Sequence, residues 1–229
     1  MKKVVIFIAP PGAGKGTQAN LLAGLYGFVH IDTGRYGQNL IYSKESESDP
    51  ILLRERKNFE DGVLFTPSWT LKMVSDLTLR IANAGLDVTY SGSPRTIFEA
   101  FGDEENKGLI TLHNEIFGRE NMYIFRINID EETSIKRNSQ RQVCSLCGLP
   151  KLAGDHGKTC VVCGALLTTR GKLDEVETIK VRLSQYRERT RPIEERLKSE
   201  GYTIHDIDGE PAPYLVFEKI RNVLGLKKI

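Results

Sequence analysis

One stretch decides the fold of this chain: Lys3-Val4-Val5-Ile6-Phe7-Ile8-Ala9-Pro10-Pro11-Gly12-Ala13-Gly14-Lys15-Gly16-Thr17-Gln18. The apolar run over residues 3–9 predicts a buried strand, a glycine-rich loop follows it directly, and the amphipathic run over 18–25 predicts a helix. Glycines let successive backbone N–H groups converge on phosphate oxygens, and the positive end of the following helix attracts the same anions. Strand, loop and helix in this order therefore predict a phosphate cradle.

The loop also carries its own cation. Lys15 is placed as a point charge for the β- and γ-phosphates of a nucleotide, and Thr17 is placed to contact Mg²⁺ or a phosphate. The strict pattern G-x4-G-K-[ST] is not met, because Ala9 stands at the first glycine position and Gly16 follows the lysine. A simple glycine-rich turn is the alternative, but the flanking strand and helix favour phosphate binding.

Helical patterns separate short β-rich runs along the rest of the chain. The runs cover residues 3–9, 28–31, 86–91, 122–129 and 202–207. Strands that alternate with helices predict a parallel sheet covered on both faces. Two segments interrupt this rhythm, and we expect them to leave the core as excursions: residues 32–67 and 142–177. The core then consists of residues 1–31, 68–141 and 178–229.

Length and charge narrow the class of protein. A chain of 229 residues with 40% hydrophobic composition suits one sizeable core. The net charge of +2, from 32 basic and 30 acidic residues, gives no overall cationic field for nucleic acid. No stretch approaches the roughly 18 apolar residues of a membrane helix, and the apolar start runs straight into Pro10-Pro11-Gly12, which suits a strand better than a signal peptide. We expect a cytoplasmic protein that binds neither nucleic acid nor membranes.

All four cysteines lie in one segment, spaced as Cys144-x2-Cys147-x12-Cys160-x2-Cys163. A glycine after each pair eases the tight turns that aim two sulfurs at one ion. The spacing predicts a closed, tetrahedral and therefore structural zinc site, although it does not distinguish zinc from iron. Two disulfides would be the alternative in a secreted protein. A zinc ribbon that grips nucleic acid is disfavoured because the flanks lack a basic and aromatic face.

Several motifs resemble those of adenylate kinases and their close relatives, and the resemblance runs through almost the whole chain. Residues 11–18 resemble the P-G-x-G-K-G-T-Q loop of that family. Ile31-Asp32-Thr33-Gly34 and Asp61-Gly62-Val63-Leu64-Phe65-Thr66-Pro67 are similar to the segments that open and close its monophosphate-binding excursion. Ser91-Gly92-Ser93-Pro94-Arg95-Thr96 resembles its D-G-F-P-R-T motif, and the cysteine segment resembles its zinc lid.

The resemblance implies an α/β fold of the P-loop NTPase type. Its parts would be a five-stranded parallel sheet flanked by helices, a helical monophosphate-binding excursion over 32–67 and a small zinc lid over 142–177. The implied reaction is reversible phosphoryl transfer from ATP to AMP, giving two ADP, with Mg²⁺ as cofactor and a structural Zn²⁺. We expect a monomer rather than an oligomer.

The resemblance also assigns residues to the two nucleotides. The implied ATP site consists of Gly12, Ala13, Gly14, Lys15, Gly16, Thr17, Arg137 and Arg141. The implied monophosphate site consists of Thr33, Gly34, Gln38, Leu64, Phe65, Gly92, Arg95, Glu99, Arg170 and Arg182. The implied catalytic residues are Lys15, Arg95, Arg141, Arg170 and Arg182. Arg137 would stack on the donor base and Arg95 would clamp the acceptor phosphate, while closure of the lid would deliver Arg170 and Arg182.

Three positions depart from the family pattern and leave the acceptor open. Ser91 replaces an aspartate that holds Mg²⁺ through water, and Gln38 replaces an arginine that binds the acceptor phosphate, a loss that Arg35 compensates if its helix turns it inward. Glu99 replaces a glutamine that reads adenine, and an ionised carboxylate only accepts hydrogen bonds. A kinase for another monophosphate, GMP first, and a nucleotide-binding regulatory protein with little turnover are the alternatives.

Overall fold

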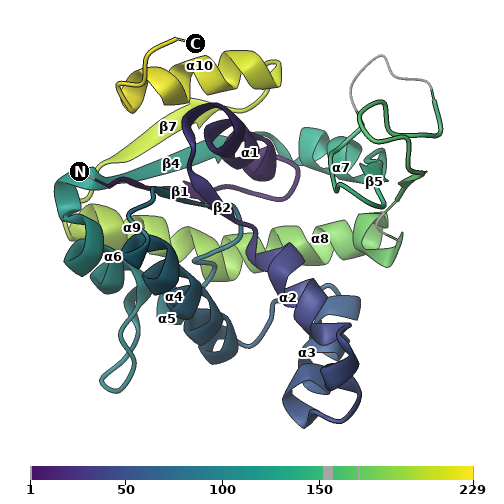
Figure 1. The fold of residues 1–229 in the computed structure, drawn as a ribbon, viewed down its shortest axis with the longest axis horizontal. Helices are drawn as coiled ribbons and strands as arrows, with labels where there is room; N and C mark the ends of the chain where they lie inside the picture. The colour runs from purple at the N-terminus through teal and green to yellow at the C-terminus, as the bar shows by residue number, and fades with distance from the viewer. Residues whose placement is uncertain (1, 152–156, 170, 229) are drawn as a thin grey trace.

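The computed structural model describes residues 2–151, 157–169 and 171–228, and its centre is a twisted sheet wrapped by helices (Figure 1). The strands of this sheet are β1 (Val4–Ile8), β2 (Val29–Ile31), β3 (Val88–Tyr90), β4 (Met122–Asn128) and β7 (Ile204–Asp208). Their order is β2-β3-β1-β4-β7, and every pairing is parallel. This confirms the predicted five-stranded parallel sheet, with strands that fall on the five β-rich runs.

Strand β1 divides the core, because successive side chains of a strand point to opposite faces of the sheet. Val4, Ile6 and Ile8 join one buried cluster, and Val5 and Phe7 join the other. The first cluster includes side chains of α4 (Pro67–Asn83), α5 (Ile97–Phe101), α6 (Leu109–Phe117) and α9 (Arg191–Ser199). The second includes side chains of α1 (Lys15–Tyr26) and α10 (Pro213–Val223). Helices therefore cover both faces, as the alternating pattern predicts.

The strand register sets where a ligand can bind. Ile6 of β1 and Ile31 of β2 both pair with Tyr90 of β3, so these three strands end at the same edge of the sheet. The phosphate loop, the start of the next helix and the segment from Ser91 follow those ends. In open parallel sheets, ligands bind in the crevice outside the carboxyl ends of the strands. The site is therefore expected at this edge.

The chain between β2 and α4 leaves the sheet as a helical excursion, seen below α8 in Figure 1. It contains α2 (Thr33–Ile41), the short 3₁₀ helix η1 (Lys44–Glu47) and α3 (Pro50–Glu60). Both α-helices begin with an aspartate cap: Asp32 accepts a hydrogen bond from Arg35 N, and Asp49 accepts one from Ile51 N. Gly37 lets α2 approach the ring of Phe65, because a Cβ there would lie 2.5 Å from that ring.

The second excursion lies between α7 (Glu131–Ser139) and α8 (Val176–Gln185). It contains a two-stranded antiparallel sheet, β5 (Val143–Cys144) with β6 (Leu167–Thr168), and the 3₁₀ helix η3 (Gly171–Asp174). A π-helical turn, η4 (Tyr186–Thr190), joins α8 to α9, and η2 (Arg119–Asn121) precedes β4.

Within the described residues, no helix combines the length and the apolar character needed to cross a membrane.

Candidate functional site

The phosphate loop turns on two glycines with left-handed backbone conformation, Gly12 (φ 80°) and Gly14 (φ 89°). Helix α7 also leaves no room for a side chain at Gly12, because a Cβ there would lie 2.6 Å from Asn138 Nδ2. The hydroxyl of Ser134 donates a hydrogen bond of 2.7 Å to the carbonyl of Pro11. Helix α7 therefore braces the loop that the sequence predicts to hold phosphates.

Ala9, the residue that departs from the strict loop pattern, fits the structure without distortion. Its methyl group lies in the buried cluster beneath α1 and is 5% exposed. Its carbonyl accepts a hydrogen bond of 2.7 Å from Lys15 Nζ, and the carbonyl of Pro10 accepts a second of 2.8 Å. Ala13 is buried in the same cluster, so only its backbone faces the loop interior.

Lys15 is surrounded by like charges. Burial lowers the pKa of Lys15 well below its usual range, and the positive charges of Arg95, Arg182 and Arg141 lower it further, in that order. The carboxylate of Asp32 acts in the opposite sense. A bound polyphosphate would relieve both effects, because it brings negative charge to the middle of the cluster. The arrangement is therefore that of an anion site.

Two adjoining pockets share Lys15, Arg95 and Arg182, and together they form one cleft along the predicted sheet edge. The smaller pocket is lined by Thr33, Gly34, Leu64, Phe65, Gly92 and Glu99 among others. The larger pocket has a volume of about 1260 Å³ and is lined by Gly12, Gly14, Gly16, Thr17, Gln38, Arg137 and Arg141 among others. The structure thus brings together the predicted site residues, except that Ala13 is buried and Arg170 lies outside the described residues.

The smaller pocket has an aromatic wall that sequence analysis missed in part. The rings of Phe59 and Phe65 are stacked with centroids 5.7 Å apart, and Trp69 meets Phe65 edge-on at 5.1 Å. Phe59 belongs to α3, and its place in the helical pattern does not reveal which side it faces. Among the described residues, Thr33 Oγ1 is buried without a hydrogen-bond partner. A flat aromatic wall beside a free hydroxyl suits a nucleobase.

Two hydrogen bonds, with Gly92 and Thr190, hold Arg95 in place and leave the terminal nitrogens of its guanidinium facing the cleft. Its Nε donates a hydrogen bond of 2.7 Å to the carbonyl of Gly92, and its own carbonyl accepts one of 2.8 Å from Thr190 Oγ1. Within the described part of the chain, its two terminal nitrogens form no hydrogen bond or ion pair. Burial lowers the pKa of Arg95, and the carboxylates of Glu99 and Asp32 oppose that shift. A planar donor pair that faces a cleft suits a phosphate.

Glu99 lines the smaller pocket but also caps a helix. Thr96 Oγ1 accepts a hydrogen bond of 3.1 Å from Glu99 N at the start of α5, and the Glu99 carboxylate accepts one of 2.9 Å from Arg95 N. Burial raises the pKa of Glu99 to about 6, although the hydrogen bond from Arg95 N opposes the shift. The spacing Thr96-x2-Glu99 is that of a capping box, with the carboxylate bonded to the N–H of Arg95 in place of that of Thr96. This second role was missed, although the sequence carries its signal.

Three arginines that flank the second excursion are positioned by polar contacts. Arg141 forms an ion pair of 3.0 Å with Asp174, whose side chain is 3% exposed. Arg137 donates hydrogen bonds of 2.9 Å to the carbonyls of Gly209 and Glu210, beyond β7. Arg182 donates one of 3.2 Å to the carbonyl of Leu173. Each guanidinium therefore has a defined place around the cleft.

Arg35 joins the two excursions instead of standing in for the missing cation at position 38. Its Nη1 donates a hydrogen bond of 3.2 Å to the carbonyl of Cys147, and Gly148 leaves room for the guanidinium. Gln38 lines the larger pocket on the same helix. The first excursion also approaches helix α8 at Gly62, where a Cβ would lie 2.5 Å from the methyl group of Thr178. Both excursions thus stand over the cleft.

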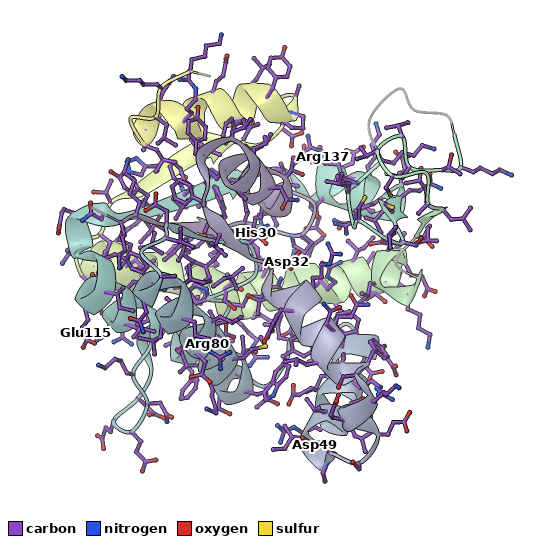
Figure 2. All side chains as sticks on the ribbon, viewed as in Figure 1. His30, Asp32, Asp49, Arg80, Glu115 and Arg137 are labelled. Atoms are coloured by element: carbon purple, nitrogen blue, oxygen red, sulfur yellow. The ribbon has the colours of Figure 1, made fainter. Side chains whose placement is uncertain are left out.

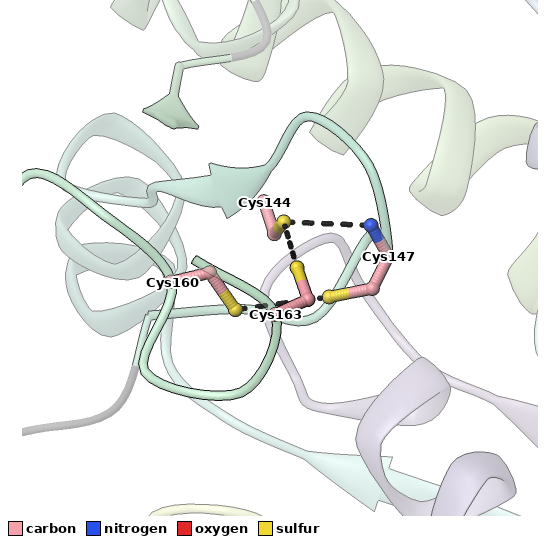
Figure 3. A group of neighbouring side chains, drawn as sticks. All are labelled: Cys144, Cys147, Cys160 and Cys163. Carbon is pink, nitrogen blue, oxygen red and sulfur yellow. Dashed lines mark hydrogen bonds between the residues drawn. The ribbon is translucent and has the colours of Figure 1, made fainter. Parts of the chain in front are cut away.

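The four cysteines gather at one point of the second excursion (Figure 3). Their sulfurs all lie within 4.8 Å of one another, with Cys144 Sγ 3.3 Å from Cys163 Sγ and Cys147 Sγ 3.8 Å from Cys160 Sγ. A tetrahedral zinc ion with bonds of about 2.3 Å requires sulfurs about 3.8 Å apart. The cysteines are free and not disulfide-bonded. The donor set therefore fits the predicted metal.

One turn of the cysteine site is already arranged as a metal knuckle. Cys144 Sγ accepts hydrogen bonds of 3.4 Å from both Leu146 N and Cys147 N. These N–H groups, that of Cys147 first, lower the pKa of the Cys144 thiol to about 6. A thiolate is the form that binds metal.

Comparison with known proteins agrees with this geometry. A model of the family described as adenylate kinase matches residues 7–202. The chain is similar to an adenylate kinase of Clostridium beijerinckii, with 31% identity over 98% of this chain and 99% of the relative. It is also similar to adenylate kinases of Clostridium botulinum, with 30% identity, and Clostridium tetani, with 31% identity, each over 96% of this chain and 98% of the relative.

We predict one metal ion per chain, detectable by elemental analysis of protein purified without added metal. Cys160→Ser, or a chelator, should lower the melting temperature without unfolding the core at room temperature, because the second excursion has little apolar core of its own. Ser145→Ala, at an exposed position of the same loop, serves as the control and should change neither quantity. Protein that contains neither zinc nor iron, or that forms disulfides when freshly reduced, would contradict the prediction.

A second prediction concerns pH. The pKa of Glu99 is about 6 in the folded state against 4.5 for an ordinary glutamate, so its protonated form favours folding below about pH 4.5 and that contribution is lost as the pH rises through 6. Glu99→Gln does not titrate. Relative to wild type, the variant should gain up to about 2 kcal/mol of unfolding free energy between pH 4.5 and 7.5. Urea unfolding at a series of pH values measures this, and a pH-independent difference between the two proteins would refute it.

Proposed function

The chain belongs to the adenylate kinase family, and we propose on that basis that ATP and AMP occupy the two ends of the cleft and exchange one phosphoryl group. As a member of this family it is a phosphotransferase. The observation that carries the proposal is that the two pockets meet at Lys15, Arg95 and Arg182. Phosphates bound at either end would face each other across these three cations.

We assign the donor end to the phosphate loop. The triphosphate of ATP would accept hydrogen bonds from backbone N–H groups over residues 12–17, at the positive end of α1. Lys15 would exchange its contacts with the carbonyls of Ala9 and Pro10 for phosphate oxygens. Arg141, braced by Asp174, would contact the same phosphates, and Arg137 would lie against the base.

We assign the acceptor end to the smaller pocket. Phe65, supported by Phe59, would pack against the base, with Thr33 Oγ1 and the backbone near Leu64 as polar contacts. Arg95 would clamp the phosphate with its free guanidinium fork. The remaining residues assigned to this nucleotide are Gly34, Gln38, Gly92, Glu99, Arg170 and Arg182.

In phosphoryl transfer between two nucleotides, the protein forms no covalent bond with the substrates and acts by positioning them and stabilising charge. An oxygen of the acceptor phosphate attacks the γ-phosphorus of ATP, the bond from that phosphorus to the β-phosphate oxygen breaks, and ADP leaves at each end. Lys15, Arg95, Arg141, Arg170 and Arg182 would stabilise the charge on the transferred group, because fixed cations need no reorganisation during the reaction. Mg²⁺, when bound, neutralises phosphate charge, and Thr17 offers it a hydroxyl oxygen. Closure of the two excursions would exclude water, which otherwise competes as acceptor.

We further propose that the chain works as a monomer in the cytoplasm. The residues assigned to both nucleotides line two pockets that meet within a single copy of the chain, which is compatible with a monomer. Four free cysteines gathered closely enough to hold one metal ion suit a reducing compartment.

GMP is the second candidate acceptor, and Glu99 is the observation that favours it. Guanine presents two adjacent N–H donors that suit a carboxylate, whereas adenine pairs best with a group that both donates and accepts. Glu99 lines the pocket, but its carboxylate already accepts hydrogen bonds from Arg95 N and Thr96 Oγ1. AMP remains the first choice because these contacts tie the carboxylate to the protein.

Lys15→Ala should lower the rate of transfer from ATP to AMP at least about a hundred-fold while the fold stays intact, because a preorganised cation at the developing charge is typically worth that much. A coupled assay of ADP formation measures the rate, and circular dichroism checks the fold. Lys72→Ala, which removes an exposed lysine from α4, is the matched control and should leave the rate unchanged. A well-folded Lys15→Ala protein with near-normal turnover would remove the loop from the mechanism.

The base preference is tested by the ratio of kcat/KM for AMP and for GMP in wild type and in Glu99→Gln. If Glu99 reads the base, the substitution should shift the ratio toward AMP by about five- to hundred-fold, since pairing one more buried polar group is worth roughly 1–3 kcal/mol. A ratio that stays within about twofold of wild type would show that Glu99 caps α5 without reading the base. Parallel tests with CMP and UMP define the acceptor class.

A further inference from the structure

The phosphate end of the cleft contains a carboxylate among its cations. The described residues that line the larger pocket include seven cationic side chains: Lys15, Arg35, Arg95, Arg137, Arg141, Lys172 and Arg182. Among the same described residues, Asp32 and Glu60 are the carboxylates of that pocket. Glu60 accepts a hydrogen bond of 3.0 Å from the hydroxyl of Tyr42 in the helical excursion. Asp32 is therefore the carboxylate of this pocket that, among the described residues, accepts no hydrogen bond from a side chain and lines the pocket together with the phosphate loop.

The strand register places Asp32 beside the loop. Ile31 of β2 pairs with Tyr90 of β3, so Asp32 and Ser91 follow paired residues at the same edge of the sheet. Ser91 N also donates a hydrogen bond of 3.4 Å to the carbonyl of Ile31. On the other side of β3 lies β1, which leads through the phosphate loop into α1, and Thr17 lies in the first turn of that helix. Asp32 and Ser91 thus follow adjacent strand ends, and Thr17 lines the same pocket from the first turn of α1.

The side chain of Asp32 has bonding capacity to spare. Its Oδ1 accepts the capping hydrogen bond of 3.1 Å from Arg35 N. Over the residues that the structure describes, the second oxygen forms no hydrogen bond and the carboxylate forms no ion pair. Its charge nevertheless raises the pKa of Lys15 and of Arg95, so it stands within electrostatic reach of both phosphate-binding cations. Figure 2 shows Asp32 and His30 at the centre of the molecule, where β2 passes into α2.

Ser91 is an oxygen donor without charge. Its hydroxyl lies 2.7 Å from His30 Nε2, and His30 Nδ1 lies 2.8 Å from Asn20 Oδ1. Because Asn20 Oδ1 only accepts, the proton of the imidazole is on Nδ1, and Ser91 donates its own proton to Nε2. The lone pairs of Ser91 Oγ therefore remain available, but any charge compensation for a divalent cation must come from another residue.

We propose that Asp32 is the carboxylate that holds the Mg²⁺ of the bound nucleotide, directly or through water, with Thr17 and Ser91 as neutral oxygen donors. Mg²⁺ takes oxygen ligands and is commonly bound through one or two carboxylates together with phosphates and waters. Asp32 places such a carboxylate in the pocket that the loop residues line. The inference rests on the proposed function and adds to it the residue that recognises the metal.

Asp32→Asn tests the inference because asparagine caps a helix as well as aspartate does but carries no charge. The probe is ATP, titrated calorimetrically once with excess Mg²⁺ and once with EDTA. We expect the affinity for Mg·ATP to fall about 10- to 100-fold, as it does when a partner of a bound metal is lost. The affinity for metal-free ATP should stay equal or rise, because a negative charge beside the triphosphate is removed. Asp32→Ser, which also caps a helix, should behave in the same way.

Asp49→Asn is the matched control. Asp49 caps α3 by accepting a hydrogen bond of 2.7 Å from Ile51 N and lies at the far end of the excursion in Figure 2, so the substitution removes the charge of a capping residue without touching the cleft. It should leave both affinities at the wild-type value. Equal losses with Mg²⁺ and with EDTA, or no loss in either, in folded Asp32→Asn would overturn the inference. A wild-type protein that binds neither form of ATP would instead overturn the proposed function.

Discussion

The burial of Lys15 among arginines is the interaction on which the rest of the structure depends. Desolvation and three like charges all disfavour its protonated form, and the carbonyls of Ala9 and Pro10 offset only part of this. Other residues hold the arginines around Lys15 in place. Asp174 forms an ion pair with Arg141, and Gly92 and Thr190 form hydrogen bonds with Arg95. A polyphosphate that enters the cleft meets cations already in place, so little reorganisation remains for the reaction itself.

The parallel sheet explains why these cations meet at all. Strands β1, β2 and β3 end at one edge, and helices cover both faces, so groups far apart in sequence can converge only outside that edge. The excursions after β2 and after α7 then stand over the cleft from two sides and touch where Arg35 donates to the carbonyl of Cys147. A four-cysteine metal site suits the second excursion, which is too small to stabilise itself by apolar burial.

Local patterns in the sequence predict much of this. The apolar runs mark all the strands of the sheet, the glycine pattern marks the loop, and the cysteine spacing marks the metal site, because each signal lies within a few neighbouring residues. Contacts between distant segments carry no such signal. Spacing does not reveal that Asp174 pairs with Arg141, that Arg35 reaches the cysteine loop, or that Phe59 stacks on Phe65. Glu99 illustrates the limit, because its place in the motif indicates the base pocket while its hydrogen bonds also cap α5.

Incubation of the purified protein with Mg²⁺ and ADP alone tests the central claim most directly. If the cleft holds two nucleotides with their phosphates facing the shared cations, one ADP must serve as donor and another as acceptor. Phosphorus NMR should then show ATP and AMP appearing in equal amounts until equilibrium, without inorganic phosphate. Unchanged ADP, or release of inorganic phosphate in place of AMP and ATP, would contradict the account.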